Sequence, residues 1–126
     1  MSQKKKILVF DDDPDIGIFC KTVLETMGWE VKVFHKAFGA AEVVEVEKPD
    51  LIILDIMMEQ SDSGIRLARE LEDKGIPIFL LSAIARATGA VLDHRELPVL
   101  EVINKPIEPQ ELVAKVSRVL GEERRA

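Results

Sequence analysis

An uninterrupted aliphatic run ends abruptly at a single acid near the middle of this 126-residue chain. The run is Leu51 to Leu54, and Asp55 follows it directly. Because the run lacks the alternation of a half-exposed strand, it predicts a strand covered on both faces, as in the middle of a parallel sheet. In open α/β sheets, ligands bind beyond the carboxyl ends of the strands. Asp55 is therefore the first candidate for chemistry.

Four other segments are predicted to be strands, namely residues 7–10, 29–34, 77–81 and 99–103. Segment 7–10 ends at the acids Asp11 and Asp12, and segment 77–81 ends at Ser82. Segment 29–34 alternates between apolar and polar side chains, and segment 99–103 contains Glu101. These two patterns suit strands at the edges of a sheet.

Segments with apolar residues at helical spacing lie between the predicted strands. We expect helices at residues 14–27, at 37–46, from about 65 to a stop at Gly75, and at 109–120. Residues 84–97 predict only a weak or irregular fourth helix, because Gly89 and a polar run interrupt their apolar pattern. Strands that alternate with helices predict a three-layer α/β sandwich around a five-stranded parallel sheet. The edge-like second and fifth strands favour the flavodoxin-like order 2-1-3-4-5.

This strand order brings together the ends of the first and third strands, and with them Asp11, Asp12 and Asp55. Three converging carboxylates repel one another unless a cation lies among them. Mg²⁺ prefers few carboxylates together with water and phosphate oxygens, so the cluster predicts a site for Mg²⁺ and a phosphoryl group, where Mn²⁺ could replace Mg²⁺. Ser82 and Lys105, at the ends of the fourth and fifth strands, can donate to phosphoryl oxygens.

Length and composition predict one cytoplasmic domain over residues 1–126, with a core from about 6 to 121 and no output domain. The net charge of −6 argues against nucleic-acid binding. No signal peptide or membrane-length apolar run is apparent. The single cysteine, Cys20, is expected to fill the core rather than to react.

Some polar residues near the predicted site have ordinary structural explanations. Asp13, before Pro14, is expected to cap the first helix. His35 and His94 have no partner at metal-ligand spacing, so both are interpreted as ordinary, partly exposed histidines. The side chain of Met57 is expected to pack, although its backbone carbonyl is well placed to be a ligand.

The chain resembles the receiver domain of two-component response regulators, of the stand-alone type. The resemblance covers essentially the whole chain and rests on four motifs: the acidic pair Asp11-Asp12, "LDIMM" around Asp55, "LLSA" at Ser82 and "NKP" at Lys105. It implies that Asp55 accepts a phosphoryl group from a phosphohistidine of a sensor histidine kinase or a phosphotransfer protein.

The resemblance also implies roles for the other site residues. Asp12, Asp55 and the Met57 carbonyl would ligate Mg²⁺, and Asp11 would contribute through water. Ser82 and Lys105 would bind the phosphoryl oxygens, and the peptide bond after Lys105 is often cis in the family. A protein of this type passes its signal to a separate output protein, as a monomer or a weak phosphorylation-dependent dimer, and turns over no separate substrate.

Three departures from the family pattern bear on how such a chain would signal. Glu59 stands where the family usually has proline, and Gly64 arrives one position late, which predicts a longer loop. Val102 occupies the position of the usual aromatic switch residue. Pro98-Val99 replaces a common Gly-Ala pair.

Two other functions remain open from the sequence. A degenerate receiver could act as a binding module that needs no phosphorylation, and Val102 favours this reading. A haloacid-dehalogenase-like phosphatase would use Asp11 as its nucleophile, because "VFDDDPD" also places two acids, Asp11 and Asp13, after a strand. The short chain and the position of Asp55 argue against the phosphatase.

Overall fold

The computed structural model describes residues 4–83 and 97–121. The five strands are β1 (Lys6–Phe10), β2 (Glu30–Phe34), β3 (Leu51–Asp55), β4 (Ile78–Ser82) and β5 (Glu101–Asn104). The helices are α1 (Pro14–Glu25), α2 (Ala40–Glu47), α3 (Ser63–Glu70), a 3₁₀ turn η1 (Glu72–Lys74) and α5 (Pro109–Leu120). The expected weak helix at 84–97 falls almost entirely outside the described residues.

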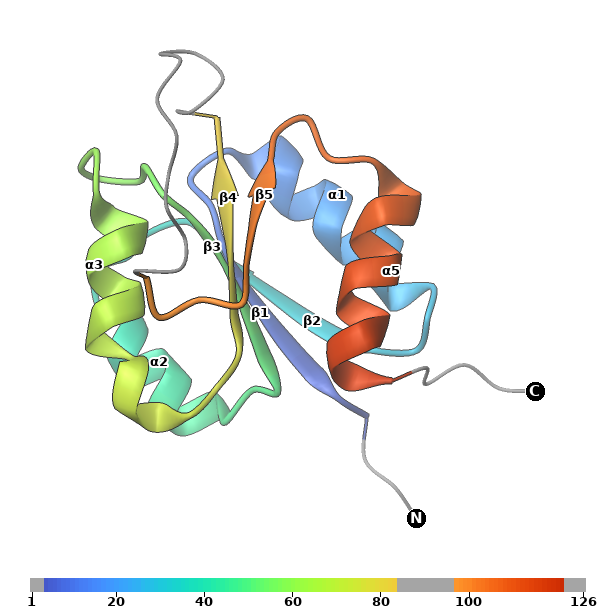
Figure 1. Cartoon of the computed structure of the whole chain (residues 1–126), viewed down its shortest axis with the longest axis horizontal. Coiled ribbons are helices and arrows are strands. Elements are labelled where there is room, and N and C mark those ends of the chain that lie inside the picture. Colours follow the sequence, from blue (N-terminus) through green and yellow to red (C-terminus); the bar gives the residue numbers. More distant parts are fainter. Residues whose placement is uncertain (1–3, 84–96, 122–126) are drawn as a thin grey trace.

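The strands form one parallel sheet in the order β2-β1-β3-β4-β5, which confirms the predicted flavodoxin-like topology. Helices α1 and α5 cover one face, and α2 and α3 cover the other (Figure 1). The alternating strand β2 and the short strand β5 lie at the two edges, as their polar residues predicted.

Successive side chains of a strand point to opposite faces, so the sheet divides the core into two apolar clusters. Ile7 and Val9 of β1 contribute to the cluster under α1 and α5, whereas Leu8 and Phe10 contribute to the cluster under α2 and α3. All of β3 is buried, from Leu51 to Asp55. The run that ends at Asp55 therefore lies in the middle of the molecule, as expected.

Several element boundaries differ from the sequence prediction. Helix α2 begins at Ala40 rather than at residue 37, because Gly39 adopts a left-handed conformation with φ of 79° directly before it. Helix α3 ends at Glu70, and the chain reaches Gly75 through the 3₁₀ turn. Strand β5 begins two residues later than predicted, because only Glu101 to Asn104 pair with β4.

The starts of α1 and α5 agree with the sequence prediction. The side chain of Asp13 accepts a hydrogen bond from Asp15 N at 2.9 Å, which is an N-cap of α1. Pro109 occupies the first turn of α5. Cys20 is buried in the core, as predicted, and so is Trp29. None of the helices in the described ranges is both long and apolar enough to cross a membrane.

Candidate functional site

Three carboxylates meet at the carboxyl edge of the sheet. Asp11 and Asp12 follow β1, and Asp55 ends β3, which pairs directly with β1. One oxygen from each of the three groups lies within 4.8 Å of the others. Asp11 and Asp55 are almost fully buried, while Asp12 is exposed. This arrangement places two acids inside the sheet edge and one at its opening to solvent.

Lys105 supplies the positive charge of the site. Its Nζ lies 3.1 Å from Asp11 Oδ2 and donates a hydrogen bond of 3.2 Å to Asp55 Oδ1. The backbone fixes the starting point of this side chain, because Lys105 N donates to Ser82 O at 3.0 Å. The peptide bond between Lys105 and Pro106 is cis, as the family resemblance implied. Lys105 therefore contacts two of the three carboxylates from the end of a neighbouring strand.

The electrostatics of the site show that its negative charge is not fully compensated. Burial, and then the neighbouring charge of Asp11, raise the pKa of Asp55 to about 6, although Lys105 opposes this shift. Burial works against the charge of Lys105, but hydrogen bonds and charges from Asp11 and Asp55 raise its pKa above the ordinary value. An additional cation beside the acids would relieve their repulsion.

Two buried polar atoms at this edge are available to a ligand. Ser82 Oγ and Asp11 Oδ2 have no hydrogen-bond partner among the described residues, although the Lys105 ammonium is close to Asp11. Native proteins rarely leave such atoms without a partner unless a ligand, ion or water completes them. Oxygen donors in this number fit a hard divalent cation such as Mg²⁺.

Ser82, Met57 and Val102 lie on three different elements. Ser82 ends β4, one residue beyond the Leu81 that pairs with Asp55. Met57 lies in the β3–α3 loop, two residues after Asp55. Its side chain is 46% exposed, so the prediction that it packs was wrong. Val102 pairs with Leu80 on β5 and packs at the margin of the α2–α3 cluster. The β3–β4 register thus brings Ser82 to the edge that carries Asp55.

Gly64 is a site residue that the sequence reasoning missed. It lies in the first turn of α3, so close to β3 that a Cβ atom would collide with the backbone carbonyl of Asp55. Gly64 N also donates to Ile56 O at 2.7 Å. The late arrival of this glycine was visible in the sequence, but its contact with the strand end was not.

Two further missed contacts involve the β2–α2 loop. The carboxylate of Glu59 accepts hydrogen bonds from the backbone N–H groups of Ala37 and Phe38, both at 2.8 Å. His35 Nδ1 lies 3.1 Å from the backbone carbonyl oxygen of Asp11. His35 was interpreted as an ordinary exposed histidine; it is exposed, but it contacts the acidic turn.

The fold and the site define a class: a doubly wound α/β domain with carboxylates and a lysine at the carboxyl edge of its sheet. The family model of the response regulator receiver domain matches residues 7–117. The chain belongs to this family of two-component signalling domains, as its sequence motifs had indicated.

Similar proteins agree with this membership. The chain is 36% identical over 118 residues to the alkaline phosphatase synthesis transcriptional regulatory protein PhoP of Bacillus subtilis, covering 92% of this chain and 48% of that protein. It is 34% identical over 116 residues to the DNA-binding response regulator MtrA of Mycolicibacterium smegmatis, covering 91% and 50%. The chain thus spans about half the length of these relatives.

Solved structures show the same fold. The BeF₃-activated N-terminal receiver domain of Klebsiella pneumoniae RstA superposes with a TM-score of 0.77 at 30% identity, over 92% of this chain and 98% of that one. The receiver domain of the Francisella response regulator 1452 superposes with a TM-score of 0.79 at 30% identity, over 92% and 96%.

Proposed function

We propose that this chain is a Mg²⁺-dependent phosphoacceptor, phosphorylated on Asp55 by a phosphohistidine of a sensor histidine kinase or phosphotransfer protein. The single observation that carries the proposal is the placement of Asp55. Its carboxylate lies 3.2 Å from the Lys105 ammonium and within 4.8 Å of carboxylate oxygens of Asp11 and Asp12. A nucleophile, a cation and candidate metal ligands therefore share one edge of the sheet.

The chemistry needs only positioning and charge compensation. A carboxylate oxygen of Asp55 attacks the phosphorus, an oxygen–phosphorus bond forms, and the bond from phosphorus to the histidine nitrogen breaks. The departing imidazole keeps the electron pair of that bond. Lys105 and the Ser82 hydroxyl donate hydrogen bonds to the phosphoryl oxygens. These bonds stabilise the negative charge on the phosphoryl oxygens in the transition state. No separate substrate is turned over.

Mg²⁺ would be held by Asp12, Asp55 and the Met57 carbonyl, with Asp11 contributing through water. When bound, it supplies positive charge to the phosphoryl oxygens and relieves the repulsion among the acids. The raised pKa of Asp55 and the closeness of the three carboxylates support this assignment. Mn²⁺, which has similar ligand preferences, is expected to substitute.

Phosphorylation would add about 1.5 to 2 negative charges at Asp55 and draw Ser82 and Lys105 toward the new group. We propose that the resulting change in surface is read by a separate downstream protein. Val102 stands in place of an aromatic switch, so this chain would transmit the change without the rotation of a large ring at that position.

The test is incubation with a small-molecule phosphodonor and Mg²⁺, followed by intact-mass measurement. One added phosphoryl group that hydroxylamine removes is expected in the native chain, and none in Asp55→Asn. Retention of the label in Asp55→Asn would contradict the assignment. Absence of label in the native chain would favour a binding module that works without phosphorylation.

The phosphatase alternative has less support from the geometry. Its nucleophile would be Asp11, whose side chain is fully buried. Asp11 Oδ1 accepts a hydrogen bond from Asp13 N at 2.9 Å, and Oδ2 faces Lys105. A substrate phosphate ester would have to displace these contacts, whereas Asp55 retains 6% of its exposure to solvent. Turnover of phosphate esters that is lost in Asp11→Asn would support the alternative.

A further inference from the structure

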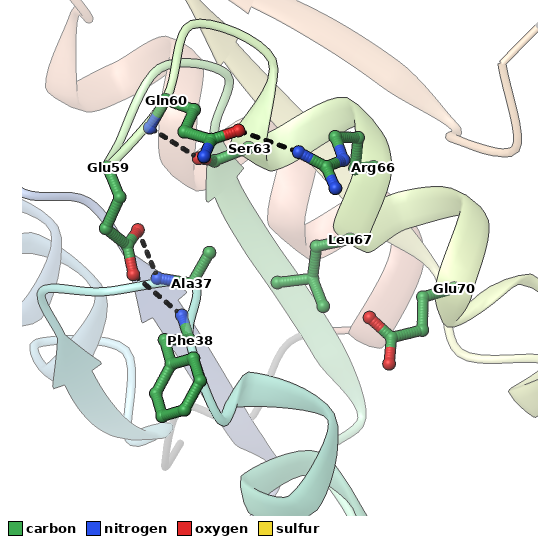
Figure 2. A pocket seen from close by; sticks show the side chains of 8 residues that line it. All are labelled: Ala37, Phe38, Glu59, Gln60, Ser63, Arg66, Leu67 and Glu70. Carbon is green, nitrogen blue, oxygen red and sulfur yellow. Dashed lines mark hydrogen bonds between the residues drawn. The ribbon is translucent and has the colours of Figure 1, made fainter.

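Glu59 joins two loops on the α2–α3 side of the sheet. Its two carboxylate oxygens accept hydrogen bonds from Ala37 N and Phe38 N, each at 2.8 Å, as Figure 2 shows. Glu59 belongs to the β3–α3 loop, four residues after Asp55, whereas Ala37 and Phe38 belong to the β2–α2 loop. The contact therefore connects the loop that carries Met57 to a segment more than twenty residues away in sequence.

The bond is of the charge-assisted kind. Partial burial opposes ionisation of Glu59, but the two backbone donors lower its pKa below the ordinary value. Neutral side chains cannot offer two equivalent acceptor oxygens to a pair of N–H groups. The proline that the family usually has at this position lacks any acceptor in its side chain.

The β2–α2 loop also contacts the backbone of Asp11 in the acidic cluster. His35 Nδ1 lies 3.1 Å from Asp11 O, and Asp11 N donates to Phe34 O at 3.0 Å. The loop from His35 to Gly39 thus touches the turn that carries Asp11 and Asp12 at one end. At the other end it is held by Glu59.

Hydrogen bonds within the β3–α3 loop connect Glu59 and its neighbours to the start of α3. Gln60 N donates to Ser63 Oγ at 2.9 Å, and Met58 N donates to Gln60 O at 3.1 Å. Arg66 donates to Gln60 Oε1 at 2.8 Å. A surface pocket of about 340 Å³ lies beside these contacts and is lined by the β2–α2 loop, the β3–α3 loop and α3 (Figure 2).

We propose that Glu59 is a positioning residue for the metal site: it holds the β3–α3 loop against the β2–α2 loop and so sets the distance between the Met57 carbonyl and the Asp11-Asp12 turn. The inference rests on the proposed function, because it concerns the same cation. It assigns to this chain a contact that the sequence pattern of the family does not provide.

The physical reason is that metal affinity depends on groups that orient the ligands as well as on the ligands themselves. A backbone carbonyl in a loop is a weak ligand unless the loop is already held in place, since ordering the loop on binding would subtract from the binding free energy. Glu59 orders the loop before the cation arrives.

The test is titration of the whole chain with Mn²⁺ alone, monitored by electron paramagnetic resonance, with Mg²⁺ as competitor. Glu59→Ala is expected to weaken the affinity by about tenfold. Glu59→Gln keeps one acceptor oxygen and should fall between Ala and the native chain. Glu70→Ala is the matched control, since Glu70 lines the same pocket but makes no hydrogen bond to the β2–α2 loop within the described residues.

Glu59→Gln and Glu70→Ala together distinguish an effect of the Glu59 hydrogen bonds from an effect of its negative charge. If Glu59 acted only through its negative charge, Gln and Ala would weaken the affinity equally, and Glu70→Ala would show a related loss; that result would overturn the proposal. Unchanged affinity in Glu59→Ala would overturn it as well. Failure of the native chain to bind Mn²⁺ or Mg²⁺ would instead contradict the proposed function, so the two failures are distinguishable.

A second readout needs no metal. Hydrogen exchange measured by NMR should show the amides of Ala37 and Phe38 protected in the native chain and in Glu70→Ala. In Glu59→Ala their exchange should be at least about tenfold faster, because each amide loses its acceptor. Equal protection in the Glu59 and Glu70 variants would show that the hydrogen bonds of Glu59 do not order the β2–α2 loop in solution, and would overturn the proposal.

Discussion

Lys105 Nζ lies between Asp55 and Asp11, 3.2 Å from an oxygen of the first and 3.1 Å from an oxygen of the second. The three side chains come from the ends of different strands, and the lysine side chain is only 19% exposed. Among the residues that the structure describes, it is therefore the main compensating charge for the two buried acids in the metal-free protein.

Replacing this lysine should destabilise the metal-free fold. Lys105→Met leaves two buried carboxylates without their cation, and we expect the free energy of unfolding at pH 7.5 to fall by about 2 kcal/mol. Urea denaturation in the presence of a chelator measures this change. Lys115→Met is the matched control, because Lys115 is buried to the same extent but pairs with the more exposed Glu101 at 3.1 Å. Equal losses in the two variants would contradict the central role of Lys105.

Neutralising Asp55 should have the opposite effect on stability. The pKa of Asp55 is raised from 3.8 to about 6 in the metal-free fold, so folding favours the protonated acid. Its stabilising contribution is fully present below pH 4 and is lost as the pH rises through about 6. Asparagine cannot ionise, so Asp55→Asn does not lose stability as the pH rises.

We therefore expect Asp55→Asn to be more stable than the native chain at pH 7.5 without Mg²⁺, by up to about 3 kcal/mol. The difference should shrink toward pH 4, and thermal unfolding across this range measures it. Saturating Mg²⁺ should narrow the gap at pH 7.5 by stabilising only the native chain. A gap that is independent of pH would show that the ionisation of Asp55 is not its cause.

Gly64→Ala should be strongly destabilising. The added methyl group meets the backbone of Asp55, which cannot move without disturbing β3, so we expect a loss of about 3 kcal/mol. Gly17→Ala provides the comparison, because its new methyl group meets only the side chain of Val33, and alanine favours the helix. Denaturant unfolding of both variants distinguishes a backbone collision from a side-chain one. A mild effect at Gly64 would mean that α3 can shift away from the strand end.

Cys20 should be unreactive in the folded protein. Burial, and then the charge of Asp11, raise the pKa of its thiol to about 12. At pH 8 only about one molecule in ten thousand would carry the reactive thiolate, and the core also blocks access. A disulfide-exchange reagent is expected to modify Cys20 at the rate of global unfolding, with prompt reaction in denaturant. Rapid modification under native conditions would indicate that α1 opens locally.

The topology of the sheet could be predicted from the sequence because its signals are local. Uninterrupted runs such as Leu51 to Leu54 can only be covered on both faces, and the alternation in β2 places that strand at an edge. The convergence of Asp11, Asp12 and Asp55 then follows from strand order alone, and the structure confirms it.

The missed features depend on contacts between segments distant in sequence. Glu59 reaches residues 21 and 22 positions away, and His35 reaches across 24, so neither partner is visible in a local pattern. The requirement for glycine at position 64 depends on how closely α3 approaches β3, which no periodicity encodes. The start of α2 was set by Gly39, whose left-handed conformation directly precedes Ala40 and is not indicated by the apolar periodicity of the segment.

Lys105 is joined to the sheet by both its backbone and its side chain. Its N–H is bonded to the end of β4, and its ammonium contacts acids at the ends of β1 and β3. A single residue thus connects the carboxyl ends of three adjacent strands. A change in charge at Asp55 therefore alters the electrostatic interactions of a residue that contacts all three strand ends, without rearrangement of a helix or strand.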